Sequence, residues 1–221
     1  RRLLSVVGPD QLMRILARML DPAEFLSPYG LRTLSRAHLE KPFTVVLGDN
    51  EFTVGYEPAE STTAMFGGNS NWRGPVWFPV NYLIIEGLRS FGEFFGDHLL
   101  IEYPTGSGNK HTFTEIADDL TRRLVSIFLL DEHGRRPVHG SVELFQRDER
   151  WRDLIPFHEY FHGDTGRGLG ASHQTGWTAL VIDMIITLHT KRGAPPEPGE
   201  PAPDPRRRRW PRRRPWSRRR S

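Results

Sequence analysis

Four segments of this chain repeat apolar residues at the spacing of amphipathic helices, and this periodicity constrains the fold most. The first begins at Pro9, a first-turn proline, and ends near Asp21. Its apolar positions are Leu12, Ile15, Leu16 and Met19. The other helices are expected over 76–95, 113–130 and 176–190, and a Thr112–Glu115 capping box precedes the third. The pattern predicts an all-α fold.

The segments between these helices are long and rich in glycine and aromatic residues. Residues 25–38 are expected to form a long loop, and 43–47 with 52–56 a small β-hairpin around residues 48–50. Long loops in a domain are usually functional. A helical toroid, whose end loops form the site, meets this description, whereas a plain bundle does not need such loops. We therefore expect part of a toroid with a hairpin insertion.

Composition divides the chain into a body, 1–193, and a tail, 194–221. The tail holds ten Arg against three acidic residues, for a charge of +7, while the body has a charge of −4. The tail is Pro-rich as well and is expected to be disordered. The tail could be a basic arm that binds phosphates, or it could be an unselected extension of the chain. We favour the second and expect no nucleic-acid partner, because nothing in the body suggests one.

The chain has no cysteine, which excludes disulfides and thiolate chemistry and fits a reducing compartment. No apolar run reaches the roughly 18 residues that a membrane span needs. We therefore expect a cytoplasmic protein without a membrane partner. The chain opens at Arg1 without an initiator Met and looks cut in mid-sequence, so an upstream targeting signal stays open.

Residues 67–82 gather aromatic and amide side chains around the start of the second expected helix. The candidates for sugar contacts here are Trp72, Arg73, Trp77, Asn81 and Tyr82. Sugar faces stack on aromatic rings, and sugar hydroxyls bond to amide and guanidinium groups. The same residues could equally be core, with Trp77 packed inside and Trp72 closing a helix end.

Residues 157–177 place Glu159 among aromatic side chains just before a glycine-rich loop. A carboxylate there can act as a general base, and glycines let the backbone approach a ligand. Alternatively, Glu159 bonds only to local backbone. His158, His162 and His173 lack a recognised metal spacing, so no metal or other cofactor is expected. No Lys-Ser/Thr follows the glycines and no Gly-x-Ser-x-Gly is present, which leaves phosphate-loop and serine-hydrolase chemistry unsupported.

Together the two segments resemble glycoside hydrolase family 63 and the mannosylglycerate hydrolase-like glucosidases, in the carboxy-terminal half of the catalytic domain. The likeness rests on residues 71–77 with Asn81-Tyr82, on Glu159-Tyr160-Phe161 with Asp164-Thr165-Gly166, and on 173–178; residues 25–35 match a preceding loop. The resemblance implies an (α/α)6 barrel that hydrolyses α-glycosidic bonds with inversion. It implies that Glu159 is the general base, with the five residues named above, and more weakly His173 and Trp177, lining the sugar pocket.

The chain departs from this family in two respects. The acid of the family is an Asp in an earlier motif that this chain does not contain, and only four or five of twelve barrel helices are expected. We therefore expect the upstream half of the same barrel to be the partner of this chain, which alone would be inactive. The substrate would be an oligosaccharide or small glycoside. The alternative is a catalytically incomplete, carbohydrate-binding remnant.

Overall fold

In the computed structural model of the chain, residues 3–63 and 71–190 are described. The chain divides into a unit of Arg1–Thr190 and a second unit of Lys191–Ser221. The tail that the sequence predicts to be disordered lies outside the described residues.

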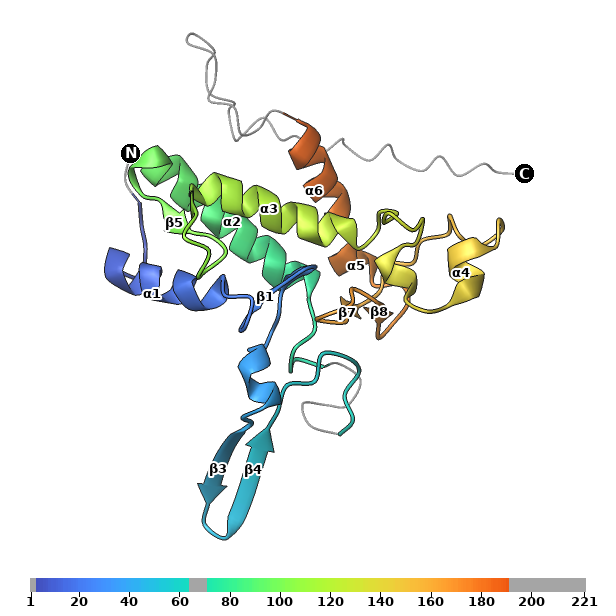
Figure 1. The fold of residues 1–221 in the computed structure, drawn as a ribbon, viewed down its shortest axis with the longest axis horizontal. Helices are drawn as coiled ribbons and strands as arrows, with labels where there is room; N and C mark the ends of the chain where they lie inside the picture. Colours follow the sequence, from blue (N-terminus) through green and yellow to red (C-terminus); the bar gives the residue numbers. More distant parts are fainter. Residues whose placement is uncertain (1–2, 64–70, 191–221) are drawn as a thin grey trace, which may run out of the picture. The chain divides into compact units, whose positions relative to one another are not determined.

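The three longest helices among the described residues of the first unit are α1 (Pro9–Met19), α2 (Phe78–Phe95) and α3 (Phe113–Ser126). Helices α2 and α3 lie side by side in Figure 1. The end of α2 meets the start of α3, where Phe91 and Phe95 contact Phe113 at ring-centroid distances of 5.5 and 5.7 Å. A Cβ on Gly92 would overlap the Thr114 hydroxyl, so glycine permits this close crossing.

The predicted helix starts and ends are confirmed at some positions and corrected at others. Helix α1 matches, and the Thr112–Glu115 capping box forms. Helix α2 begins at Phe78 instead of residue 76, because Val76 pairs with other loops and Trp77 is extended. The last predicted helix is broken at Ala179 into α5 (Thr175–Thr178) and α6 (Leu180–His189).

The remaining elements are short. Four antiparallel strand pairs are present in the described residues: β1 (Leu26–Ser27) with β2 (Gly30–Leu31), β3 (Phe43–Leu47) with β4 (Asn50–Val54), β5 (Ile101–Glu102) with β6 (Lys110–His111), and β7 (Tyr160–Phe161) with β8 (Gly168–Leu169). The short helices are α4 (Glu143–Arg147) and the 3-10 turns η1 (Arg36–Leu39), η3 (Gly96–His98) and η4 (Pro137–His139). The predicted hairpin is confirmed as β3–β4, which projects away from the helices in Figure 1, but its second strand covers Asn50–Val54 instead of 52–56 because Asn50 already pairs with Leu47.

The hydrophobic core surrounds α3. Its residues Phe113, Ile116, Leu120 and Leu124 have no exposed surface. Phe78, Phe128 and Phe161 complete the core as an edge-to-face cluster with centroid distances of 5.2–5.8 Å. Because Phe161 belongs to the strand pair that follows Glu159, this packing ties the candidate site to the helices.

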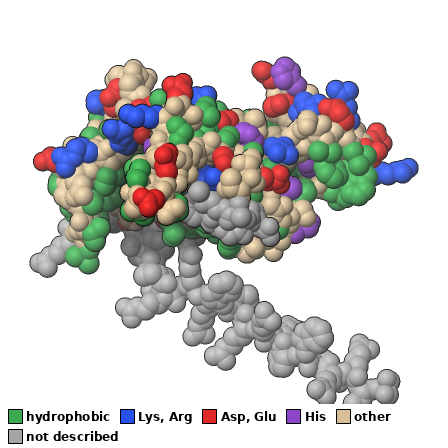
Figure 2. All heavy atoms as spheres, turned by 90° about the horizontal axis from the view of Figure 1, so that it is seen from below, with side chains coloured by type: hydrophobic (Ala, Val, Ile, Leu, Met, Phe, Trp, Pro, Cys, Tyr) green, Lys and Arg blue, Asp and Glu red, His purple; other side chains and the backbone are tan. Residues whose placement is uncertain are grey.

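The surface face in Figure 2 mixes basic and acidic side chains instead of gathering one sign. In the described part of the chain, none of the helices is long and apolar enough to cross a membrane. The described residues combine helices with short strand pairs and long loops, while the all-α class and closure into a toroid stay predictions.

Candidate functional site

Val76 joins the loops that hold the predicted site residues. Its N–H donates to the Phe161 carbonyl at 2.8 Å and its carbonyl accepts from the Phe161 N–H at 3.0 Å. On its other side it forms a bridge with Arg32. Residues 25–35, 71–82 and 157–177, which are distant in sequence, therefore meet at one place.

An aromatic stack occupies this meeting point. Trp72 lies on Trp77 with ring centroids 4.0 Å apart and planes 9° from parallel, and Tyr160 stacks on Trp77 at 4.8 Å. Trp177 meets the same ring at 5.4 Å with a tilt of 53°. Tyr160 directly follows Glu159, so the stack leads from Trp72 to the residue beside the candidate base.

The two tryptophans of the first motif differ sharply in exposure. Trp77 is 0% exposed, and its Nε1–H donates to the Asn71 carbonyl at 3.0 Å. Asn71 in turn donates to the Glu57 and Ala59 carbonyls at 2.7 and 2.6 Å. Trp72 is 42% exposed and offers ring surface to a ligand, which Trp77 does not.

Three other residues predicted to touch sugar are bonded within the protein. Arg73 is buried and paired with the Glu57 carboxylate at 2.7 Å. Asn81 is 0% exposed. Its side-chain amide accepts from the Leu31 N–H at 2.7 Å and donates to the Leu31 carbonyl at 3.0 Å. The Tyr82 hydroxyl donates to Asp183 of α6 at 2.8 Å. These contacts give Arg73, Asn81 and Tyr82 roles in holding the framework.

Glu159 lies half-buried just before β7. Its N–H donates to the Ala171 carbonyl at 2.9 Å, and its Oε2 accepts from the Ala171 N–H at 3.3 Å. A Cβ on Gly170, whose φ is +66°, would be 2.8 Å from Oε2 and 2.7 Å from the Tyr160 ring. The glycine thus lets the loop approach the Glu159 carboxylate, whereas the approach to a ligand that the sequence predicts stays a prediction.

A buried cluster of Arg32, Tyr56 and Asp164 supports this loop, and sequence reasoning missed it. The guanidinium of Arg32 donates to Asp164 Oδ1 at 2.8 Å from Nη2 and to the Tyr56 hydroxyl at 3.0 Å from Nε. The Tyr56 hydroxyl donates to the same Asp164 oxygen at 3.1 Å. Burial raises the pKa of Tyr56 well above its usual value, which keeps this donor protonated. The only sequence signal was that Arg32 and Asp164 lie within the matching motifs.

The three histidines of the second motif lie in different surroundings. His158 packs against Gly168, and burial lowers its pKa. Nδ1 of His162 accepts from the Asp164 N–H at 3.1 Å, while His173 is exposed, as is Trp177 at 36%. Within residues 3–63 and 71–190, no group of three His, Asp or Glu is placed to hold a metal ion.

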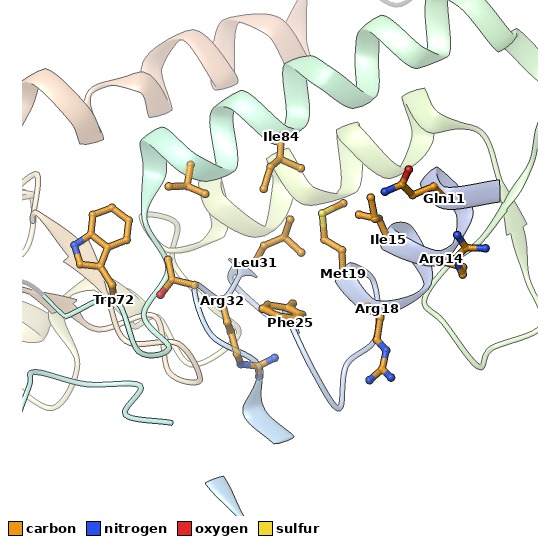
Figure 3. Close-up of a pocket in the computed structure, with 12 residues that line it drawn as sticks. Gln11, Arg14, Ile15, Arg18, Met19, Phe25, Leu31, Arg32, Trp72 and Ile84 are labelled. Carbon is orange, nitrogen blue, oxygen red and sulfur yellow. The ribbon is translucent and has the colours of Figure 1, made fainter. Parts of the chain in front are cut away.

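An open groove of about 750 Å³ begins at Trp72 and runs between α1 and α2. Figure 3 shows Ile15, Met19, Leu31 and Ile84 along its length, with Gln11, Arg14 and Arg18 at the end opposite Trp72. Seven of its twelve lining side chains are apolar, five of them aliphatic, and the other five, Gln11, Thr33 and three arginines, are polar or charged. Aliphatic side chains suit the apolar face of a helix better than a sugar, whose hydroxyls require polar partners.

Comparisons with known proteins agree on one family. Residues 3–178 match the model of the mannosylglycerate hydrolase MGH1-like glycoside hydrolase domain. An uncharacterized protein of Saccharomyces cerevisiae is 49% identical over 187 residues, which cover 84% of this chain and 17% of the relative. The mannosyl-oligosaccharide glucosidase of the same yeast is 24% identical, and a probable one of Schizosaccharomyces pombe 25%; each match covers 79% of this chain and 15% of the relative.

The chain therefore spans only about a sixth of the curated relatives, matching 17% of the first and 15% of the others. The family match covers the aromatic stack and the Glu159 loop, the parts from which the sequence resemblance was drawn. The chain belongs to the MGH1-like glycoside hydrolase family.

Proposed function

We propose that this chain is part of an inverting glycoside hydrolase that acts on an α-glucoside or α-mannoside, with Glu159 as its general base. One observation supports this most: the carboxylate of Glu159 is held beside Tyr160, whose ring continues into the stack that ends at Trp72. Sugar rings stack on exposed aromatic faces, and the exposed end of this stack is Trp72, because Tyr160 and Trp77 are buried.

In this reaction Glu159 removes a proton from water as the water attacks the anomeric carbon. The attack takes place on the face opposite the leaving group, and a carboxylic acid protonates the departing oxygen. In inverting enzymes the two carboxyl groups lie roughly 6.5–9.5 Å apart, which leaves room for the water. We assign the acid to an Asp of the upstream barrel half.

In this proposal the exposed residues among the predicted sugar-binding residues contact the substrate. Trp72 would stack on a sugar ring, while Trp177 and His173 lie on the loop and helix start that follow Glu159. Arg73, Asn81 and Tyr82 would act indirectly, by holding the loops that present Trp72 and Glu159.

The groove between α1 and α2 supports a further part of this proposal, that more barrel helices cover the chain in an (α/α)6 toroid. Its aliphatic side chains would bury the apolar stripe of a helix from the upstream half. A cysteine at Ile15, which is 45% exposed in this chain, should react with maleimide in the 221-residue protein and be protected in the full-length protein. Equal reactivity in both would exclude such a covering helix.

The test of the catalytic proposal compares the full-length protein with Glu159→Gln on a panel of α-glucosides and mannosylglycerate. Removing the base should lower kcat at least roughly 100-fold, in line with the usual contribution of a general base. NMR of the first product should show the anomer opposite to that of the substrate. Glu132→Gln is the matched control, since the Glu132 side chain is 86% exposed next to His133.

Two results would overturn the assignment. Full activity of Glu159→Gln would exclude Glu159 as the base. A folded full-length protein that binds these sugars but hydrolyses none of them would favour the carbohydrate-binding remnant, which needs only the tryptophan surface.

A further inference from the structure

We propose that His158 is a positioning residue for Glu159, holding residues 168–171 so that the carboxylate keeps its place. This role rests on the proposed function, because Glu159 matters only if it is the base. His158 does not touch the aromatic stack or a substrate surface named above; it acts through the backbone of the loop.

His158 and Glu159 both contact the short segment 168–171. Glu159 is bonded through its N–H and its carboxylate to Ala171. The ring of His158 lies directly on Gly168, where a Cβ would overlap the imidazole, and it makes a hydrogen bond with the backbone of Leu169. Movement of the His158 ring therefore shifts the strand that leads to Ala171.

A third segment is tied to His158 by its backbone. Thr178 of α5 donates its hydroxyl proton to the His158 carbonyl. The residue before Glu159 thus connects β7, β8 and α5, and α5 carries Trp177. The His158 side chain contacts β8, while its backbone carbonyl holds α5.

The geometry also assigns the tautomer of this histidine. Nδ1 is buried and, among the residues that the structure describes, has no hydrogen-bond partner, so Nε2 makes the bond to Leu169. A carbonyl accepts only from a protonated nitrogen, which places the single proton of the neutral ring on Nε2.

The charged or titratable groups facing the ring keep it neutral. These are His139 of η4, His173 and Arg167, each of which opposes a positive charge on His158. Burial, the largest cause, and these neighbours lower the pKa of His158. Protonation would place a charge at buried Nδ1 with no acceptor there, and we expect it to displace the loop.

The experiment compares His158→Ala, His158→Gln and the parent in the full-length protein, with Glu159→Gln alongside. At pH 7.5 the alanine variant should lose at least tenfold in kcat with KM changed less than twofold. Glutamine can place its amide N–H near the position of Nε2 and should recover most of the loss. His133→Gln is the control, because that side chain is 75% exposed.

The pH profile separates positioning from simple support of the fold. On the acid side, log kcat of the parent should show a limb from protonation of His158, and this limb should be absent in His158→Gln. Unchanged kcat in the alanine variant would overturn the proposal. Equal losses in both variants that follow a lowered melting temperature would also overturn it. If Glu159→Gln is itself fully active, the base assignment fails instead, and a deficit in His158→Ala would then be structural.

Discussion

Replacing Asp164 by Ala should lower the free energy of unfolding, because it leaves the buried guanidinium of Arg32 without its charged partner. The Arg32 side chain is 4% exposed, and the substitution removes its bonds to Asp164 from Nη2 and Nε at 2.8 and 3.2 Å. Bonds remain from Nη1 to the Leu26 carbonyl at 2.6 Å and from Nε to Tyr56 at 3.0 Å. The charge would then face only neutral acceptors.

The size of the loss follows from the burial of the pair. Removing one partner of a fully buried ion pair costs about 3–5 kcal/mol. Asp164 is 31% exposed, so water can reach part of the vacated site. We therefore expect about 2–3 kcal/mol, which corresponds to a fall in Tm of roughly 4–12 °C for a domain of this size.

Urea unfolding of Asp164→Ala, of Arg32→Met and of the double variant measures this effect. The double variant should be more stable than Asp164→Ala alone, since it no longer buries an unpaired charge. Glu132→Ala, at an exposed carboxylate, should stay within about 0.5 kcal/mol of the parent. A loss under about 0.5 kcal/mol in Asp164→Ala, or strictly additive losses in the double variant, would refute this reasoning.

Three further predictions follow from burial and capping. Trp77→Ala should cost about 3–5 kcal/mol in thermal or urea unfolding, whereas Trp72→Ala should cost about 1 kcal/mol and mainly raise KM for a carbohydrate substrate; equal stability losses would contradict the two roles. Thr112→Ala should cost about 1 kcal/mol in urea unfolding through loss of the capping box, and an unchanged midpoint would argue against it. Burial lowers the pKa of His139 and His158 below the ordinary 6.5, so the unfolded chain takes up these protons first as the pH falls. Stability from these two groups should be constant above roughly pH 7 and decrease below pH 6.5, and greater stability at pH 5.5 than at 7.5 would contradict this.

The helices could be predicted from the sequence because their signals are local. The apolar spacing after Pro9 and the Thr112–Glu115 pair needed no tertiary information, and both are confirmed. The errors lie where distant segments decide the conformation. Val76 leaves the helical pattern because Phe161 and Arg32 pair with it. The hydroxyl of Thr178 bonds to His158, and the last predicted helix breaks at the next residue.

The loops of the candidate site were predictable from the sequence, but the contacts within them were less so. The motifs identified the loops that meet at Val76, and Trp72 has the exposure that a stacking residue needs. Residue type alone could not show that the Asn81 amide forms hydrogen bonds to both the N–H and the carbonyl of Leu31. Nor could it show that Tyr56 completes the Arg32–Asp164 cluster, since this contact joins positions 108 residues apart in the chain.

The β3–β4 hairpin has a consequence for how this family can vary and be engineered. Phe43 lies opposite Val54 in the register, so the chain leaves the body and returns to it within about 5 Å. Within residues 3–63 and 71–190 these strands pair only with each other, and Phe43, Val46, Leu47 and Phe52 remain more than half exposed. Residues 43–54 can therefore be shortened, lengthened or exchanged for a reporter domain while the chain on either side keeps its path. Such a position lets evolution or an experimenter add a new module without redesigning the core.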